Sequence, residues 1–120
     1  MALTKSSPTQ ILSVSNLANG ASAVSSAFDV SDAIAMEIEV VLTYSTAPSS
    51  GGVEVAVYPS QDGTNFSDEA IVVGAAYPAA TSWRYILPVS VLAEKYVEIK
   101  ITNNTDQSAD VVVNVIKTTT

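Results

Sequence analysis

The chain has 120 residues, of which 12 are acidic and 5 are basic, and it contains neither histidine nor cysteine. This length fits one domain with a single hydrophobic core. The two absent residue types exclude a Ser-His-Asp triad, a Cys-His pair, a disulfide and any metal site built from thiolate or imidazole ligands. We therefore expect a protein that binds or assembles rather than an enzyme, and we expect no cofactor.

Charge and hydropathy narrow the range of partners. The net charge of -7 at pH 7 repels phosphate groups, so nucleic acid and anionic membrane surfaces are not expected partners. Only 14% of the residues are charged whereas 48% are hydrophobic, which is typical of a folded chain. No stretch has the roughly 20 apolar residues of a transmembrane helix, and the first residues lack the apolar run of a secretory signal. A weakly charged surface on a small domain favours assembly.

The segment 1–32 is poor in charge and rich in serine, alanine and asparagine. Strands are predicted over 10–15 and 21–30. Asn19-Gly20 between them is a candidate hairpin turn, because both residues tolerate positive φ. We interpret the segment as the first hairpin of the domain, and the alternative is an arm that reaches a neighbouring subunit. Candidate contacts with a subunit or a shell in this segment are Ile11 and Leu12.

A period of two dominates the middle of the chain. Every second residue from Ile34 to Tyr44 is apolar, with Glu37 and Glu39 between them, which is typical of a long strand with one buried face. The same alternation recurs twice more, and stretches rich in turn-forming residues separate the runs. Strands are predicted over 33–45, 52–60, 69–75, 81–88 and 95–103.

The last predicted strand, 109–118, breaks this alternation, because apolar residues fall on both of its faces. One interpretation is a central strand with one face in the core and the other under a loop. The other is an edge or face that pairs with a second subunit, since exposed apolar edges invite strand addition. On the second interpretation Val111, Val113 and Val115 contact a subunit or a shell.

The regular spacing of strands and turns predicts the fold class. About eight short strands without helical periodicity indicate an all-β protein. We expect residues 1–120 to form a single-domain two-sheet β-sandwich that is jelly-roll-like in its connections.

Glu37 and Glu39 lie on one face of a strand, roughly 6.5–7 Å apart at the backbone. This spacing overlaps the carboxylate separation of an inverting glycosidase. Such enzymes place the acid and the base on opposite sides of a cleft, whereas carboxylates that alternate with apolar residues are typical of a solvated strand face. We therefore assign no catalytic residues.

Oxygen-bearing side chains gather around a glycine turn. Asp62, Asn65, Asp68 and Glu69 are candidate calcium ligands, since calcium takes about six to eight oxygens. Their spacing does not match the EF-hand pattern. Asp and Asn are also common in turns because their side chains bond the local backbone, and this is the interpretation we prefer.

Aromatic side chains suit stacking on sugar rings, and Tyr58, Tyr77 and Trp83 are the candidate glycan contacts. Trp83 shares one strand face with Tyr85 and Leu87, which is typical of a stripe of core residues. Tyr58 and Tyr77 are therefore the better candidates for exposed rings.

Two segments carry a resemblance to known proteins. A strand over 53–57 runs into a Ser-x-Asp-Gly-x-x-aromatic turn from Ser60 to Phe66, and residues 94–104 form a Lys-Tyr-Val strand that ends in two asparagines. Together they resemble small all-β virion structural proteins of tailed bacteriophages, which include head decoration (cement) proteins and accessory tail proteins. The resemblance covers residues 34–116. Asp-Gly turns followed by an aromatic residue also occur in discoidin-like carbohydrate-binding sandwiches.

The resemblance implies a non-enzymatic virion protein, expected to be a capsid decoration protein that binds the outer shell and stabilises it. Its implied partners are the major capsid protein or other virion proteins, together with further copies of itself, with a trimer as one arrangement. Its implied location is the virion, assembled in the bacterial cytoplasm. The alternative from a different class is a carbohydrate- or receptor-binding sandwich of a phage tail or fibre.

Overall fold

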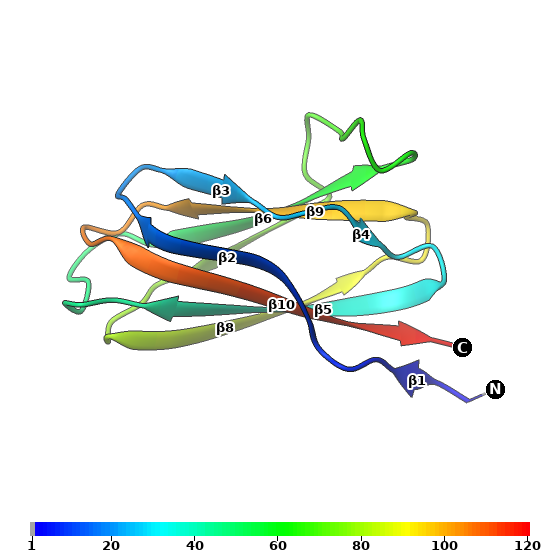
Figure 1. The fold of residues 1–120 in the computed structure, drawn as a ribbon, viewed down its shortest axis with the longest axis horizontal. Helices are drawn as coiled ribbons and strands as arrows, with labels where there is room; N and C mark the ends of the chain where they lie inside the picture. Colours follow the sequence, from blue (N-terminus) through cyan, green and yellow to red (C-terminus); the bar gives the residue numbers. More distant parts are fainter. Residues whose placement is uncertain (1) are drawn as a thin grey trace.

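The structure is a computed structural model that describes residues 2–120. This part of the chain contains ten β-strands and no helix, and hence no helix long and apolar enough to span a membrane (Figure 1). The strands are β1 (Thr4–Lys5), β2 (Thr9–Leu17), β3 (Ser22–Val24), β4 (Phe28–Asp29), β5 (Ala33–Thr43), β6 (Val53–Ser60), β7 (Val72–Ala76), β8 (Ser82–Ser90), β9 (Tyr96–Asn103) and β10 (Ala109–Thr119).

The strands form two antiparallel sheets that lie face to face (Figure 1). In the first, which we call the β10 sheet, β1 and β2 both pair with β10, and β5 and β8 follow. In the second, the β9 sheet, β3 and β4 both pair with β9, and β6 and β7 follow. The all-β sandwich of two sheets predicted from the sequence is confirmed.

The strand pairs are nested along the chain. β6 pairs with β7, β5 with β8, β3 and β4 with β9, and β2 with β10. A chain paired in this way is one long hairpin folded over into two layers, which is compatible with the predicted jelly-roll-like connections.

The core lies between the sheets and is filled by alternate residues of the strands. On β5, Met36, Ile38, Val40 and Leu42 point inward and are buried, whereas Glu37 between them is exposed. The central strands β6 and β9 add the buried side chains of Val53, Val55, Val57, Val97, Ile99 and Ile101. The period of two therefore predicted the inward face of each long strand.

Strand β10 is central in its sheet, with β1 and β2 on one side and β5 on the other. Val111, Val113 and Val115 on its inward face are no more than 1% exposed and belong to the core. Ile11 is buried in the same core, and Leu12 packs against it. The prediction that Ile11 and these three valines contact a subunit or a shell is wrong, because their own sandwich covers them. Strand β10 is central and one of its faces is in the core, as one interpretation of 109–118 has it; the loop expected over the other face remains a prediction.

The N-terminal segment forms edge strands of both sheets, with β1 and β2 beside β10 and β3 and β4 beside β9. Asn19-Gly20 forms a turn in which the Ala21 N–H donates to the Ala18 carbonyl over 3.0 Å and Gly20 has a φ of 80°. This turn joins strands of different sheets, so β2 and β3 pair with β10 and β9 and not with each other; Met1 lies outside the described residues. Positive φ indicates a turn but not which strands pair across it.

A buried polar cluster closes one end of the sandwich, at the turn between β9 and β10. The Asn103 side chain is fully buried, and its Nδ2 donates to the carbonyls of Leu17 and Gln107, each over 2.8 Å. Its Oδ1 accepts from the backbone N–H and the hydroxyl of Thr105, over 3.1 and 2.6 Å. The amide makes all of its hydrogen bonds, and Asn103 thereby ties the end of β2 to this turn.

Candidate functional site

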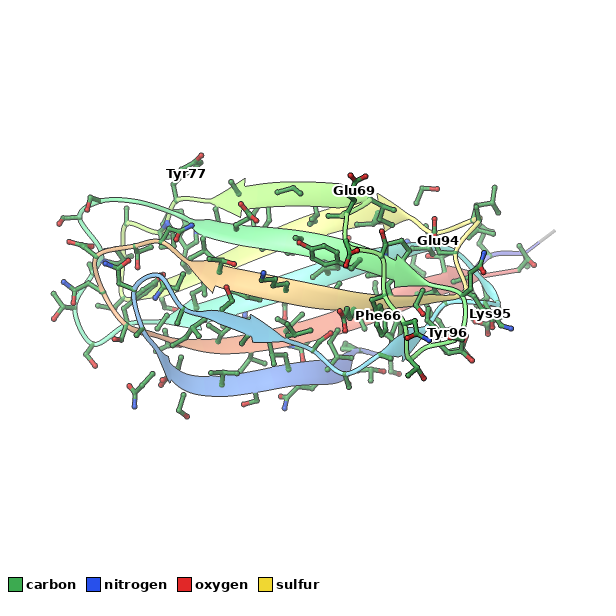
Figure 2. The ribbon with its side chains drawn as sticks, turned by 90° about the horizontal axis from the view of Figure 1, so that it is seen from above. Phe66, Glu69, Tyr77, Glu94, Lys95 and Tyr96 are labelled. Carbon is green, nitrogen blue, oxygen red and sulfur yellow. The ribbon has the colours of Figure 1, made fainter. Side chains whose placement is uncertain are left out.

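The β6–β7 loop stands up from one end of the sandwich (Figures 1 and 2). Asp62 Oδ1 accepts from the backbone N–H groups of Thr64 and Asn65, over 2.9 and 2.8 Å, and Oδ2 accepts from Asn65 Nδ2 over 2.8 Å. The Ser60 hydroxyl donates to the Asn65 carbonyl over 2.7 Å and accepts from the Gly63 N–H over 3.0 Å. Two side chains thus hold the tight turn that the sequence predicted.

The structure does not bring the four candidate calcium ligands together. Both carboxylate oxygens of Asp62 already accept hydrogen bonds from the loop, and Asn65 faces Asp62 with its Nδ2 donor. In the described chain no group of three or more acidic side chains is placed to share a metal ion, so Asp62, Asp68 and Glu69 form no such group. The loop uses the Asp62 carboxylate for its own turn, and a calcium site at Asp62, Asn65, Asp68 and Glu69 remains a prediction.

The turn makes folding stability depend on pH. Hydrogen bonds from the backbone of Asn65 and Thr64 and from the Asn65 side chain hold the pKa of the Asp62 carboxyl far below its usual value. A carboxyl with a lower pKa in the folded than in the unfolded chain stabilises the fold above the unfolded pKa. This contribution is lost as the pH falls toward the folded value. We therefore expect the unfolding temperature to fall below about pH 4.

The Asp62→Asn variant isolates this effect, with unfolding followed by circular dichroism at neutral and acid pH. The variant should lose part of the pH dependence. Asp29 and Asp106, whose pKa values are lowered by hydrogen bonds from Ser31 and Ser49, should keep the rest. An identical pH dependence in both proteins would contradict the role assigned to Asp62.

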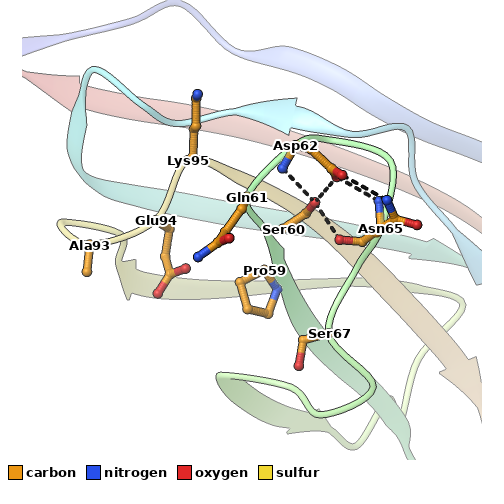
Figure 3. A pocket seen from close by; sticks show the side chains of 9 residues that line it. All are labelled: Pro59, Ser60, Gln61, Asp62, Asn65, Ser67, Ala93, Glu94 and Lys95. Atoms are coloured by element: carbon orange, nitrogen blue, oxygen red, sulfur yellow. Dashed lines mark hydrogen bonds between the residues drawn. The ribbon is translucent and has the colours of Figure 1, made fainter.

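A hollow of about 660 Å³ opens beside the β6–β7 loop (Figure 3). The end of β6, the loop and the turn that leads from β8 into β9 bound it. Its lining includes Gln61, Glu94 and Lys95, and in Figure 3 the Lys95 side chain points away from the other two. The hollow offers hydrogen-bonding groups without an aromatic platform, and we assign it no ligand.

A second hollow, of about 330 Å³, lies on the outer face of the β9 sheet, and we call it the Tyr58 groove. Tyr58 points outward from β6, opposite Glu98 of β9, and Lys100 is the next outward residue of β9. Phe66 reaches the groove from the β6–β7 loop, where a bridge between Ser60 and Phe66 folds the loop back onto β6. The remaining lining residues are Val24, Ser67 and Asp68.

Sequence reasoning identified Tyr58 but missed the residues that surround it. Glu98 and Lys100 occupy outward positions of a predicted strand, so alternation alone could have placed them on one face. Phe66 carried no such signal, because only the folded loop brings it to the sheet. Glu98 is half-buried, and burial raises the pKa of its carboxyl.

The three candidate glycan contacts do not form one platform. Tyr58 lies in the groove, whereas Tyr77 follows β7 and is 70% exposed, at the opposite end of the molecule from Phe66 (Figure 2). Trp83 is half-buried on the inward face of β8 and packs against the core, as do Tyr85 and Leu87. The stripe of core residues predicted for this strand is therefore present.

Glu37 and Glu39 project from the outer face of the β10 sheet. Glu39 Oε2 lies 3.1 Å from Arg84 Nε, and Glu39 Oε1 accepts a hydrogen bond from Asn114 Nδ2 over 3.1 Å. Glu37 is exposed to solvent. The two carboxylates form a solvated strand face, as predicted, and an exposed ion pair of this kind contributes little to stability.

Five of the seven large apolar side chains exposed in residues 2–120 lie on or next to β7 and β8, the free edges of the two sheets. Val73 projects from the outer face of the β9 sheet and Ile86 from the outer face of the β10 sheet. We call this side of the molecule the β7–β8 flank; its exposed apolar residues are Ile71, Val73, Tyr77, Ile86 and Leu92. Single exposed apolar residues are common on protein surfaces, whereas a contiguous apolar patch is typical of a surface that another molecule covers. Sequence reasoning placed this role on the last strand instead.

The free edge of β8 is protected against strand addition. The Val91 N–H donates to the Ile34 carbonyl, and the Thr81 carbonyl accepts from the Tyr44 N–H, so the odd-numbered residues of this stretch bond β5. Pro88, which has no N–H, therefore faces the free edge. A strand added there would lack one hydrogen-bond donor at Pro88, which interrupts its pairing with β8. Contacts on this flank are expected to involve side chains.

Comparison with known proteins identifies a fold and no family. Neither a model of a known protein family nor a curated protein sequence matches the chain. The SPBc2 prophage-derived protein YomS matches with a TM-score of 0.57 and 11% identity, over 99% of this chain and 96% of that one. A protein of Bacillus endospore appendages, described as a family of disulfide-linked pili, matches with a TM-score of 0.52 and 12% identity, over 98% of this chain and 88% of that one. At such low identity these matches show a shared fold alone.

Proposed function

We propose that the chain is a non-enzymatic structural protein of a phage-related particle, and specifically a decoration protein that binds the outside of the capsid and stabilises it. The observation that carries the proposal is the fold likeness to a prophage-derived protein, which spans nearly the full length of both chains. The second similar structure comes from pili, which are themselves assemblies. Both comparisons support a role in a multi-subunit structure.

The partners in this proposal are the major capsid protein or other virion proteins and further copies of the chain, with a trimer as one symmetric arrangement. Many copies on one shell bind with avidity, so each contact can be small. The net charge of -7 keeps decorated particles apart in solution. Because the chain has no cysteine, its contacts include no disulfide, unlike the disulfide links of the similar pili.

Particles from a strain that lacks the gene provide the test. Purified chain is added to them, and the temperature at which they release their nucleic acid is measured. We expect saturable binding at a fixed number of copies per particle and release at a higher temperature, because a ligand that binds only the intact shell stabilises it. Absence of binding at micromolar concentration would contradict the proposal.

The β7–β8 flank is the contact surface in this proposal, and Leu92→Asp tests it. Leu92 is 73% exposed in the turn after β8, so a charge there is expected to leave the fold intact. We expect it to weaken binding to the particles about tenfold, the effect of losing one buried apolar anchor. Ser13→Asp, at an exposed position of the opposite edge strand β2, is the control and should bind like the parent chain. Equal binding by both variants would exclude Leu92 from the contact.

A further inference from the structure

We propose that the Tyr58 groove binds a neutral pyranose unit of a glycan. This binding function goes beyond the structural role proposed above and rests on the side chains of the groove, not on the likeness of the fold. A saccharide site needs an apolar platform for one face of the sugar ring and a few polar groups for its hydroxyls. The groove supplies both within a hollow of about 330 Å³.

The apolar platform consists of Tyr58 and Phe66, which line the groove from two different segments. The C–H groups on one face of a pyranose ring pack against aromatic rings, and the tyrosine also presents a hydroxyl at its polar end. Val24 of β3, which is 48% exposed, extends the apolar wall on the far side of Lys100. One sugar ring therefore finds apolar surface and hydrogen-bonding groups in the same place.

The platform is formed before any ligand binds. Phe66 pairs with Ser60, and the Ser67 N–H donates to the Pro59 carbonyl over 2.9 Å, which fixes the loop on both sides of the aromatic ring. The hydrogen bonds that Asp62 accepts close the preceding turn. A preformed site loses little conformational entropy on binding, which benefits a ligand with a small contact area.

The rim of the groove offers an acceptor and a donor with no ionic partner. Glu98 and Lys100 are consecutive outward residues of β9, yet within residues 2–120 neither takes part in an ion pair. The carboxylate can accept hydrogen bonds from sugar hydroxyls, and the ammonium group can donate to them. Glu98 is half-buried, and burial raises the pKa of its carboxyl, so a sugar hydroxyl that donates to it would replace part of its hydration.

Charge selects a neutral sugar over an acidic one. Glu98 and Asp68 both line the groove, against the single positive charge of Lys100. The net charge of -7 adds a repulsive field for carboxylated or phosphorylated ligands. The same charges disfavour a nucleotide, although its base would also suit an aromatic platform. A neutral oligosaccharide meets no such penalty.

Titration of the isotope-labelled full chain with chitotriose, cellotriose and maltotriose, each followed by NMR, tests the proposal. We expect saturable amide shifts with at least one of the three, centred on residues 58, 66–68, 98 and 100. Trigalacturonate, an anionic trisaccharide, is expected to bind at least about tenfold more weakly, the loss that one repelled charge produces. Absence of shifts with all three neutral sugars, or equal binding of trigalacturonate, would overturn the proposal.

Substitutions of single tyrosines locate the site. Tyr58→Ala should weaken binding about tenfold, as expected for the loss of one aromatic stacking partner. Tyr77→Ala removes an equally large exposed ring outside the groove and should leave the affinity unchanged. The reverse pattern would overturn the assignment. If the spectrum shows that Tyr58→Ala is unfolded, Phe66→Ala removes the second ring of the platform and must produce the same loss.

Discussion

Val113→Asp is expected to abolish folding of the chain. Val113 is fully buried in β10, between β2 and β5, so the substitution would transfer a carboxylate from water into the core without a partner. A change of this kind costs on the order of 5 kcal/mol, comparable with the whole stability of a marginal domain at about 5–15 kcal/mol. Circular dichroism and the dispersion of the NMR spectrum measure the outcome.

Val112→Asp is the matched control for this prediction. Val112 is the adjacent residue of the same strand, but it projects from the outer face of the β10 sheet, where it is half-buried between Ser13 and Val41. This variant should remain folded with a modestly lower unfolding temperature. If Val113→Asp folded as well as Val112→Asp, the inward face of β10 would not be core, and the interpretation of this strand as a subunit contact would return.

Asn103→Ala is expected to lower the free energy of unfolding by about 3 kcal/mol and the unfolding temperature by roughly 10 °C. The substitution removes an amide that makes four hydrogen bonds inside the protein. It leaves the Leu17 carbonyl without this donor in a region that water does not reach. Thermal and urea unfolding of the variant and the parent chain measure the difference.

The neighbouring Asn104 provides the control for Asn103. It belongs to the same turn and has the same side chain, but it is exposed to solvent. Asn104→Ala is therefore expected to change stability by less than about 0.5 kcal/mol, as is usual for a surface substitution. Equal effects at both positions would show that the buried hydrogen bonds of Asn103 do not stabilise the turn.

The long strands could be predicted because one face of each is buried. Alternation from Ile34 to Tyr44 requires that the even-numbered residues share a face, and the structure buries Met36, Ile38, Val40 and Leu42 on it. The turn at Asp62 was also predictable, since its side chain bonds the backbone only a few residues away. These features depend on neighbours in the chain.

The pairing of strands distant in sequence could not be predicted in the same way. The sequence pattern of β10 is the same for a central strand and for an edge strand. Only the pairing of β10 with β2 and β5 decides that Val111, Val113 and Val115 are core residues. The turn at Gly20 has a local cause. Which sheet the strand on each side of it joins is decided elsewhere, because β2 pairs with β10 and β3 pairs with β9. Asn103 is a common turn residue, and its burial depends on the end of β2.

The candidate sites also combine residues that the local sequence predicts with residues that only the complete fold brings together. Tyr58 was singled out by its residue type, and Glu98 lies opposite it because two predicted strands pair. Phe66 joins them only after the loop folds back onto β6. The β7–β8 flank was not foreseen, because sequence alone does not show which strands are left at the edges of the sheets. Surfaces that require several segments at once depend on the complete fold.

Quantitative mass spectrometry of native particles, purified from the source of this chain, tests the proposed role most directly. The number of copies of the chain is measured relative to the major capsid protein. A decoration protein predicts a ratio near one or a simple fraction of it. A handful of copies per particle would indicate the neck, tail or fibre and contradict decoration of the capsid, and absence from the particles would contradict a structural role in them.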